Sequence, residues 1–211
     1  MPLIPPTGKD FEIVEAGVHK GRCIKVIDLG TQETSYKGQI QHKHKVMIMF
    51  ELPETKMTED PNEGKPFAVA LFVTLSLDKK SNLRPLLVGW RGKDFTEEEA
   101  GNFDILKLLD QPVLINVIHN ESDGNIYANI SSLMPLKASN CPPRINPLVS
   151  FNIAEFDQST FDGLSEKMQD KIKQTPEYRA FCNPDIPSMT DEEVDNTFGN
   201  QDVDEEEPAP F

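Results

Sequence analysis

The sequence is poor in cysteine and tryptophan and has no long apolar run. Its 211 residues include three cysteines and one tryptophan. Cys23, Cys141 and Cys182 are far apart and form no CxxC pair, so neither a disulfide framework nor a zinc knuckle is expected. No stretch of about 18 apolar residues occurs, so no membrane-spanning segment is expected. The first residues lack the charged start and apolar core of a signal peptide, which favours a cytoplasmic location.

Motifs for catalysis and cofactor binding are also missing. The sequence contains no GxxxxGK[ST], GxGxxG or HExxH pattern. His42 and His44 are spaced to share one face of a strand, but no cysteine or aspartate cluster nearby would complete a metal site. The carboxylates between 94 and 104 resemble a solvated helical surface. We therefore expect a protein without enzymatic activity, cofactor or metal ion.

Positive charge is scarce overall, and it is unevenly distributed. The formal net charge is -14, yet residues 17–50 hold six Lys or Arg and only two acids. From residue 181 to the end there are ten acids and no Lys or Arg. The charge pattern therefore predicts a basic patch in the first half and an acidic tail.

The order of expected elements indicates a small β barrel. Three branched and apolar segments predict strands, with a loop over 30–39 between the first two. After the third strand, apolar residues recur at helical spacing from Ser81 onward. A second helical stretch is expected over 96–110, where Thr96 and Glu99 are spaced as a capping box. Two further strands are joined by the Asp-Gly turn chemistry of a hairpin. The expected strands are 18–29, 41–52, 66–77, 111–120 and 126–136. We predict a mainly β fold, a five-stranded OB-type barrel with a helical insert between strands 3 and 4, although other small β barrels fit the same order.

Composition divides the chain into four parts. Residues 1–14 are rich in proline and predict an irregular lead-in, and 15–137 form the OB-type barrel. Residues 138–182 are a proline-punctuated linker and a short amphipathic helix, expected over 161–174, which packs back on the barrel or on a partner. Low hydrophobicity and charge of one sign predict a disordered acidic tail over 183–211.

Alternation along two strands places cations and a ring together. In 41–52, Lys43 and Lys45 share a face with two methionines, whereas Val46, Ile48 and Phe50 face the other way. In 66–77 the odd positions are apolar and the even ones small or polar, except for one aromatic, Phe72. If the two strands are neighbours, Phe72 lies on the face of the lysines. The competing interpretation is that the lysines serve only solubility and that the C-terminal helix covers Phe72.

A protein that binds single-stranded nucleic acid needs cations that follow the phosphates and aromatic rings that stack on the bases. Trp90 is expected in the core instead, because it is in helical phase with Leu86 and Leu87. The candidate nucleic-acid contacts are Lys20, Arg22, Tyr36, Lys37, Lys43, Lys45, Phe72, Lys79, Lys80, Arg84, Arg91 and Tyr127.

The sequence ends in VDEEEPAPF, and the terminal aromatic needs an explanation. A solubilising tail would account for the acids but not for Phe211. We predict that the tail competes with nucleic acid for the basic patch and, once displaced, inserts its end into an apolar pocket of a partner. The candidate partner-binding residues are Asp204, Glu205, Glu206, Glu207, Pro210 and Phe211.

Three segments carry a resemblance. RCIKVIDLGTQ (22–32), TLSLDKKSNLRPLLVGWRGKDFTEEE (74–99) and NPLVSFNI (146–153) are similar to a bacteriophage family of single-stranded-DNA-binding proteins, over roughly residues 15–180. The tail resembles separately the acidic tails of replication proteins of this class, although bacterial ones end in Ile-Pro-Phe. The resemblance implies protection of single-stranded DNA in phage replication or recombination, in the host cell cytoplasm. It also implies a DNA polymerase, helicase or nuclease as the partner of the tail.

Two other classes of function stay open. A protein-interaction module could use the acidic tail to imitate DNA, and would bind a DNA-handling enzyme but no oligonucleotide. A nuclease or other metal enzyme would need a carboxylate cluster on the barrel, which the sequence does not indicate. Homo-oligomerisation is left open.

Overall fold

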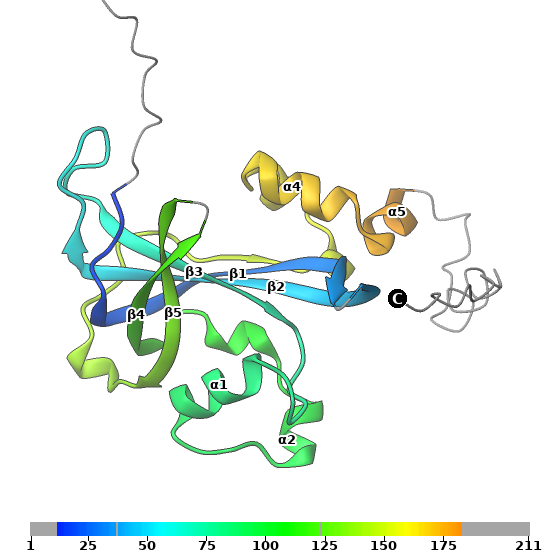
Figure 1. Ribbon diagram of the computed structural model, residues 1–211, viewed down its shortest axis with the longest axis horizontal. Coiled ribbons are helices and arrows are strands. Elements are labelled where there is room, and N and C mark those ends of the chain that lie inside the picture. Colours follow the sequence, from blue (N-terminus) through cyan, green and yellow to red (C-terminus); the bar gives the residue numbers. More distant parts are fainter. Residues whose placement is uncertain (1–11, 37, 123, 183–211) are drawn as a thin grey trace, which may run out of the picture.

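The computed structural model describes residues 12–36, 38–122 and 124–182, and within them the chain is mainly β (Figure 1). Five long strands pair antiparallel in the order β3-β2-β1-β4-β5, and a short sixth strand pairs parallel with β1. The strands are β1 (Gly17–Tyr36), β2 (Gln39–Lys56), β3 (Pro66–Thr74), β4 (Pro112–Ser122), β5 (Asn125–Pro135) and β6 (Val149–Phe151). The prediction of a mainly β fold is confirmed.

The two ends of this strand order do not join. Residues of β3 and β5 lie near each other, but no strand pairing links them in the part of the chain that the structure describes. A closed barrel requires pairing around the whole circumference. The six-stranded sheet is therefore not closed into a barrel, in contrast to the expectation from the sequence.

The first two strands extend further than expected. Residues 30–39 were predicted to form a loop, but the ladder continues from Gly30 opposite Lys45 to Tyr36 opposite Gln39. Gly30 adopts a positive φ of 66° beside a register shift, which allows the chain to bend there and resume pairing. The result is a long two-stranded arm, in which β1 and β2 stay paired beyond the position where β3 ends opposite Lys45.

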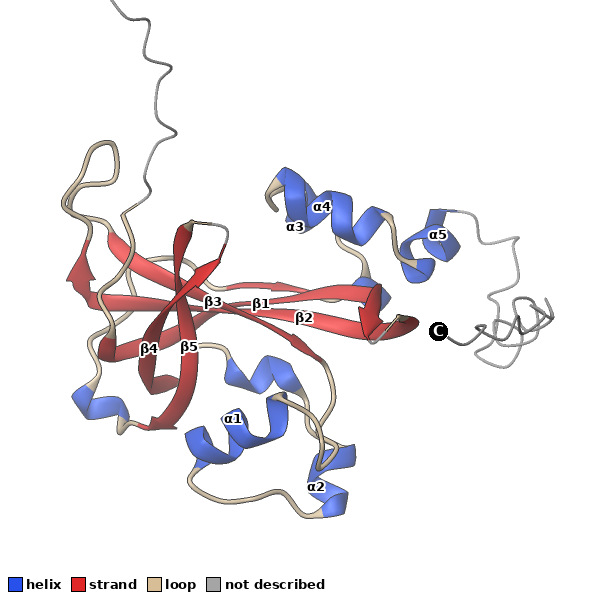
Figure 2. Ribbon diagram, in the orientation of Figure 1, coloured by secondary structure: helices blue, strands red, loops and turns tan. Residues whose placement is uncertain are grey.

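Helices cover the sheet from two sides. Figure 2 shows α1 and α2 on one side of β1–β3, and α4 and α5 on the other. One group lies in the chain between β3 and β4, and the other follows β6. The α-helices are α1 (Leu83–Arg91), α2 (Glu97–Gly101), α3 (Gln158–Asp162), α4 (Glu166–Lys173) and α5 (Pro176–Cys182). Short 3₁₀ turns are η1 (Ile105–Leu108), η2 (Ala138–Asn140) and η3 (Ile153–Glu155).

Local sequence signals account for most helix boundaries. The capping box predicted for Thr96 and Glu99 is present at the start of α2. The helix expected over 161–174 is interrupted at Gly163, which follows α3, so that α3 and α4 are separate. The first helix begins at Leu83, and the Ser81 hydroxyl accepts a bond from the Arg84 amide at 3.2 Å.

The alternation of β2 and β3 builds the main core. Val46, Ile48 and Phe50 are buried on one face, as predicted, together with Val69 of β3. From α1, Trp90 contributes to the same core, with its ring edge-on to that of Phe50 at a centroid distance of 5.4 Å. The prediction that Trp90 belongs to the core is therefore confirmed, and α1 is anchored beneath the sheet.

A second core lies on the opposite face of β1 and β2. Met47 is fully buried there against residues of the C-terminal segment, among them Phe151, Phe161 and Ile172. Aromatic contacts connect this segment internally, with Phe156 stacked on Phe181 at 4.4 Å. The C-terminal segment thus packs back on the sheet, one of the two outcomes that the sequence left open, and covers part of the face that carries Lys43 and Lys45.

Candidate nucleic-acid interface

The outer face of β2 and β3 brings cations and an aromatic ring together. Lys45 lies opposite Thr74 in the ladder, and Met47 lies opposite Phe72. The Lys45 ammonium donates to the Thr74 hydroxyl at 3.0 Å. The Phe72 side chain is 54% exposed, although it lies in the middle of a strand. The second core occupies the part of this face around Met47, and Lys43, Lys45 and Phe72 remain outside it.

A third cation comes from the C-terminal segment. The Lys171 ammonium of α4 lies 5.5 Å from the centroid of the Phe72 ring, within the range of a cation–π contact. The competing interpretation of Phe72 is therefore partly right, since α4 borders the ring but leaves half of it exposed. We call Lys43, Lys45, Phe72 and Lys171 the basic strip.

The electrostatics of the basic strip favour an anion. Partial burial lowers the pKa of Lys45, and the positive charge of Lys43 lowers it further. The two ammonium groups are therefore close enough to repel each other. Lys43 forms no ion pair within the described residues. An anion placed between the lysines would relieve this repulsion.

A polar cluster fixes the C-terminal helices beside the basic strip. The Glu177 carboxylate of α5 accepts bonds from the Thr31 amide at 3.1 Å and from the Thr31 hydroxyl at 2.5 Å. His44 lies between two carboxylates, with Nε2 2.6 Å from Asp28 and Nδ1 3.5 Å from Glu177. Its hydrogen bond with Asp28 raises the pKa of His44, although burial acts in the opposite direction. These contacts join the β1–β2 arm to α5 and so set the position of Lys171.

Three of the predicted arginine contacts serve the fold instead. Arg84 is only 7% exposed, and its guanidinium bonds Asp94 at 3.0 Å and the Phe95 carbonyl at 2.7 Å. Arg22 donates to the Pro142 carbonyl at 2.8 Å and holds the linker. Arg91 pairs with Glu99 on the α1 side of the sheet. Arg22 and Arg84 thus use their donors to hold loops together, and Arg91 lies on the side of the sheet opposite Lys43 and Lys45, so the structure does not bring these three arginines together with the lysines of β2.

The remaining candidates are dispersed. Lys20 pairs with Glu54 at 3.0 Å, and Lys79 pairs with Glu97 at 3.2 Å. Lys80 is exposed after β3, and Tyr127 is 49% exposed on β5 close to the β4–β5 turn. The Tyr36 backbone ends β1. Lys37 and the tail residues Asp204, Glu205, Glu206, Glu207, Pro210 and Phe211 lie outside the described residues.

Lys171 is the member of the basic strip that sequence reasoning missed. It lies on the polar side of an amphipathic helix, where a lysine is normally interpreted as solvated. The helix was recognised, but its contact with β3 depends on how α5 docks on the β1–β2 arm. The sequence therefore carried no signal that would have placed Lys171 beside Phe72.

No metal site is apparent in the described ranges. They contain no group of three or more His, Cys, Asp or Glu residues arranged to hold a metal ion. Among the helices of those ranges, none has the length and apolar character needed to cross a bilayer. No protein-family model matches the chain, and a search of curated proteins found no match either. The basic strip is therefore supported only by the positions of its four residues in the structure.

Proposed function

We propose that this protein binds single-stranded DNA without sequence preference and without catalysis, through the basic strip on β2 and β3. The observation that carries the proposal is Phe72, a half-exposed ring in the middle of a strand, with the Lys171 ammonium 5.5 Å from its centroid and Lys45 on the neighbouring strand. Exposed aromatic rings accept unstacked bases, and cations follow the phosphates. In phage replication or recombination, such a protein would protect single strands.

The strand order supports an OB-type architecture as part of this proposal. An OB fold is a partly open five-stranded Greek-key barrel whose second and third strands present the binding face. Here β1 lies between β2 and β4, β3 lies near β5, and helices fall between β3 and β4. In Figure 1 the turn of the β4–β5 hairpin extends to the side of β1–β3 on which α4 lies. The basic strip on β2 and β3 would then lie where OB folds bind their ligands.

The proposal is tested by titrating labelled oligo-dT at two salt concentrations. Affinity should fall with salt, because phosphate contacts release counterions. Phe72→Ala should weaken binding by about 1–3 kcal/mol, the contribution of one stacked base. The matched control is Ile145→Ala, which removes an apolar side chain of similar exposure, 59%, from the linker before β6.

The lysines are tested through the salt dependence itself. The double substitution of Lys43 and Lys45 by alanine should reduce the slope of log affinity against log salt by about 1.4, roughly 0.7 for each lost phosphate contact. Lys167→Ala on the exposed surface of α4 is the control. If oligo-dT does not bind at low salt, or if the Phe72 and Ile145 variants bind it equally, the proposal fails. A protein that then still captures a DNA-handling enzyme would be an interaction module.

The acidic tail forms the second part of the proposal. We propose that its ten acids compete with DNA for the basic strip and that its end recruits a DNA polymerase, helicase or nuclease. Deleting 183–211 should tighten oligo-dT binding and abolish recruitment. Unchanged affinity after the deletion would contradict the competition.

A further inference from the structure

The junction between α4 and α5 is held against the bend of β1. Gln32 donates from Nε2 to the Leu29 carbonyl at 2.6 Å and to the Lys171 carbonyl of α4 at 3.1 Å. Thr175, between the two helices, is fully buried, and a Cβ added at Gly30 would lie 2.8 Å from its Cγ2. The absence of a side chain at Gly30 therefore lets α5 begin directly beside β1.

This junction lies next to the lysines of β2. In the β1–β2 ladder, Gln32 lies opposite Lys43, and Gly30 lies opposite Lys45. These are the same two residues of β1 that approach the C-terminal helices. Figure 1 shows α4 and α5 on one side of β1 and β2. A change in how α5 is held on β1 would therefore move Lys171 relative to the other members of the basic strip.

Glu177 makes the polar contacts between α5 and the β1–β2 arm. Its carboxylate accepts from the Thr31 amide at 3.1 Å and from the Thr31 hydroxyl, and it lies 3.5 Å from His44 Nδ1. The other ring nitrogen of His44 lies 2.6 Å from Asp28, which also accepts from the Gly30 amide at 2.9 Å. His44 thus lies between one carboxylate of β1 and one of α5. We call Asp28, Thr31, His44 and Glu177 the His44 cluster.

The geometry of the His44 cluster fits a protonated histidine. An imidazolium donates from both ring nitrogens, whereas a neutral imidazole donates from one nitrogen and presents a lone pair at the other. A neutral ring can keep its shorter contact with Asp28, but the Nδ1 lone pair then faces the Glu177 carboxylate and is repelled by it. Loss of the proton therefore weakens the contact that joins α5 to β2 and leaves the contact with β1 in place.

No other carboxylate pairs with the His44 ring within the described residues. Asp28 comes from β1 and Glu177 from α5, and the neighbouring charges on β2 itself are Lys43 and Lys45. The hydrogen bond with Asp28 raises the pKa of His44, burial opposes it, and the charges of Asp28 and Glu177 add to the increase. The contact with α5 is therefore fully present below the ordinary pKa of 6.5 and is lost as the pH rises through the raised value.

We propose that Glu177 and His44 are positioning residues for DNA binding, which hold α5 on β1 and keep Lys171 beside Phe72 while His44 is protonated. When His44 loses its proton, α5 is held less firmly and Lys171 contributes less to the binding of phosphates. This inference rests on the proposed binding of single-stranded DNA by the basic strip. It adds a pH dependence near neutrality that lysines and an aromatic ring do not have by themselves, because the ordinary pKa of lysine is about 10.4.

The first test is the affinity of the full-length protein for oligo-dT from about pH 6 to about pH 9 at constant ionic strength. Affinity should fall about two- to fivefold as the pH rises through the raised pKa of His44, as expected for one partly exposed ion pair. His44→Gln cannot take up a proton and should show no such step, whereas His42→Gln on the same strand should retain it. Glu177→Gln keeps a carbonyl oxygen for Thr31 but not the charge, so its affinity should be low and without a step.

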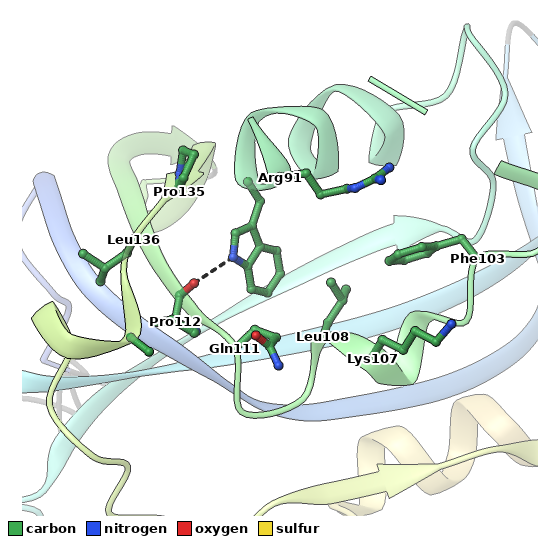
Figure 3. Close-up of a pocket in the computed structure, with 10 residues that line it drawn as sticks. Arg91, Phe103, Lys107, Leu108, Gln111, Pro112, Pro135 and Leu136 are labelled. Atoms are coloured by element: carbon green, nitrogen blue, oxygen red, sulfur yellow. Dashed lines mark hydrogen bonds between the residues drawn. The ribbon is translucent and has the colours of Figure 1, made fainter. Parts of the chain in front are cut away.

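A second pair of variants tests whether the His44 cluster acts through Lys171. Lys171→Ala lacks the ammonium that the cluster positions, so its affinity should show no step. The control is Lys107→Ala, which should behave as the wild type. Lys107 is exposed at the edge of a cavity of about 430 Å³ between α1, η1, the start of β4 and the end of β5 (Figure 3). Figure 2 shows α1 on the side of β1–β3 opposite α4. A step that persists in Lys171→Ala would mean that His44 acts on DNA directly, and would overturn the proposal.

A measurement without DNA separates this inference from the proposed function. The NMR signals of the His44 ring give the midpoint of its titration, which should move toward 6.5 in Glu177→Gln. Glu33→Gln removes an exposed acid from the same arm and should move the midpoint less. Equal midpoints in the wild type and Glu177→Gln would overturn the role of Glu177. If oligo-dT binds at no pH, the proposed function fails and this inference with it, whereas binding without a step in the wild type overturns this inference alone.

Discussion

Replacing Glu51 with glutamine should release the linker that leads to β6 and the C-terminal helices. Glu51 is fully buried on β2, and its carboxylate accepts from the Ile145 amide at 2.6 Å and from the Asn146 amide and side chain at 2.7 and 2.5 Å. Glutamine keeps the volume and one carbonyl oxygen, but its NH₂ group must face a donor. Hydrogen bonds to charged groups contribute about 1.5–3 kcal/mol each, and the relief from burying a charge offsets part of that loss.

We expect Glu51→Gln to lower the free energy of unfolding by about 2–4 kcal/mol. For a chain of this size the melting temperature should fall by about 4–15 °C. Urea unfolding followed by circular dichroism measures the first quantity, and a thermal scan the second. Glu54→Gln is the control on the same strand, because its carboxylate pairs at the surface with Lys20 and should matter by less than about 1 kcal/mol. Equal stability of the two variants would refute the role assigned to Glu51.

Two further predictions concern the arm and α1. The contribution of His44 to stability should be fully present below its ordinary pKa of 6.5 and should disappear as the pH rises through its raised pKa in the fold. In urea titrations, His44→Ala should therefore lower the free energy of unfolding less at alkaline pH than at mildly acidic pH. The pKa of Asp28 is lowered overall, since its bond with His44 and other hydrogen bonds outweigh burial, so its contribution is lost in acid as the pH falls through that lowered value. Gly89→Ala should destabilise by about 1–3 kcal/mol, because a Cβ there would lie 2.5 Å from the Leu133 carbonyl oxygen. Gly101→Ala, with open space around its Cβ position, should be neutral in the same unfolding assay.

Strand faces were predictable because their signals are local. The alternation of β2 separates Ile48 and Phe50 from Lys43 and Lys45, and the pleat of a strand converts that pattern directly into two faces. The capping box at Thr96 is equally local. Predicting the length of β1 failed, because residues 30–36 have weak strand signals and pair only through the partner strand and the bulge at Gly30.

Candidate contacts were harder to predict than strands. Lys45 and Phe72 follow from strand phase, whereas exposed and structural arginines look alike in a sequence. Arg84 illustrates this, since nothing nearby in the sequence indicates that its guanidinium is needed to hold the Phe95 carbonyl. Long-range packing determines which cations keep their charge available.

By itself the sequence determined the mainly β character, the two faces of β2 and the separation of basic and acidic segments. These depend on periodicity and composition, which act over a few residues. Tertiary structure alone decided that the C-terminal helices cover Met47 but leave Phe72 half-exposed. It also decided that the Lys171 ammonium lies beside the Phe72 ring. It also formed the cavity between α1, η1, the start of β4 and the end of β5. Contacts between distant segments depend on which apolar faces find each other, and no local pattern encodes that choice.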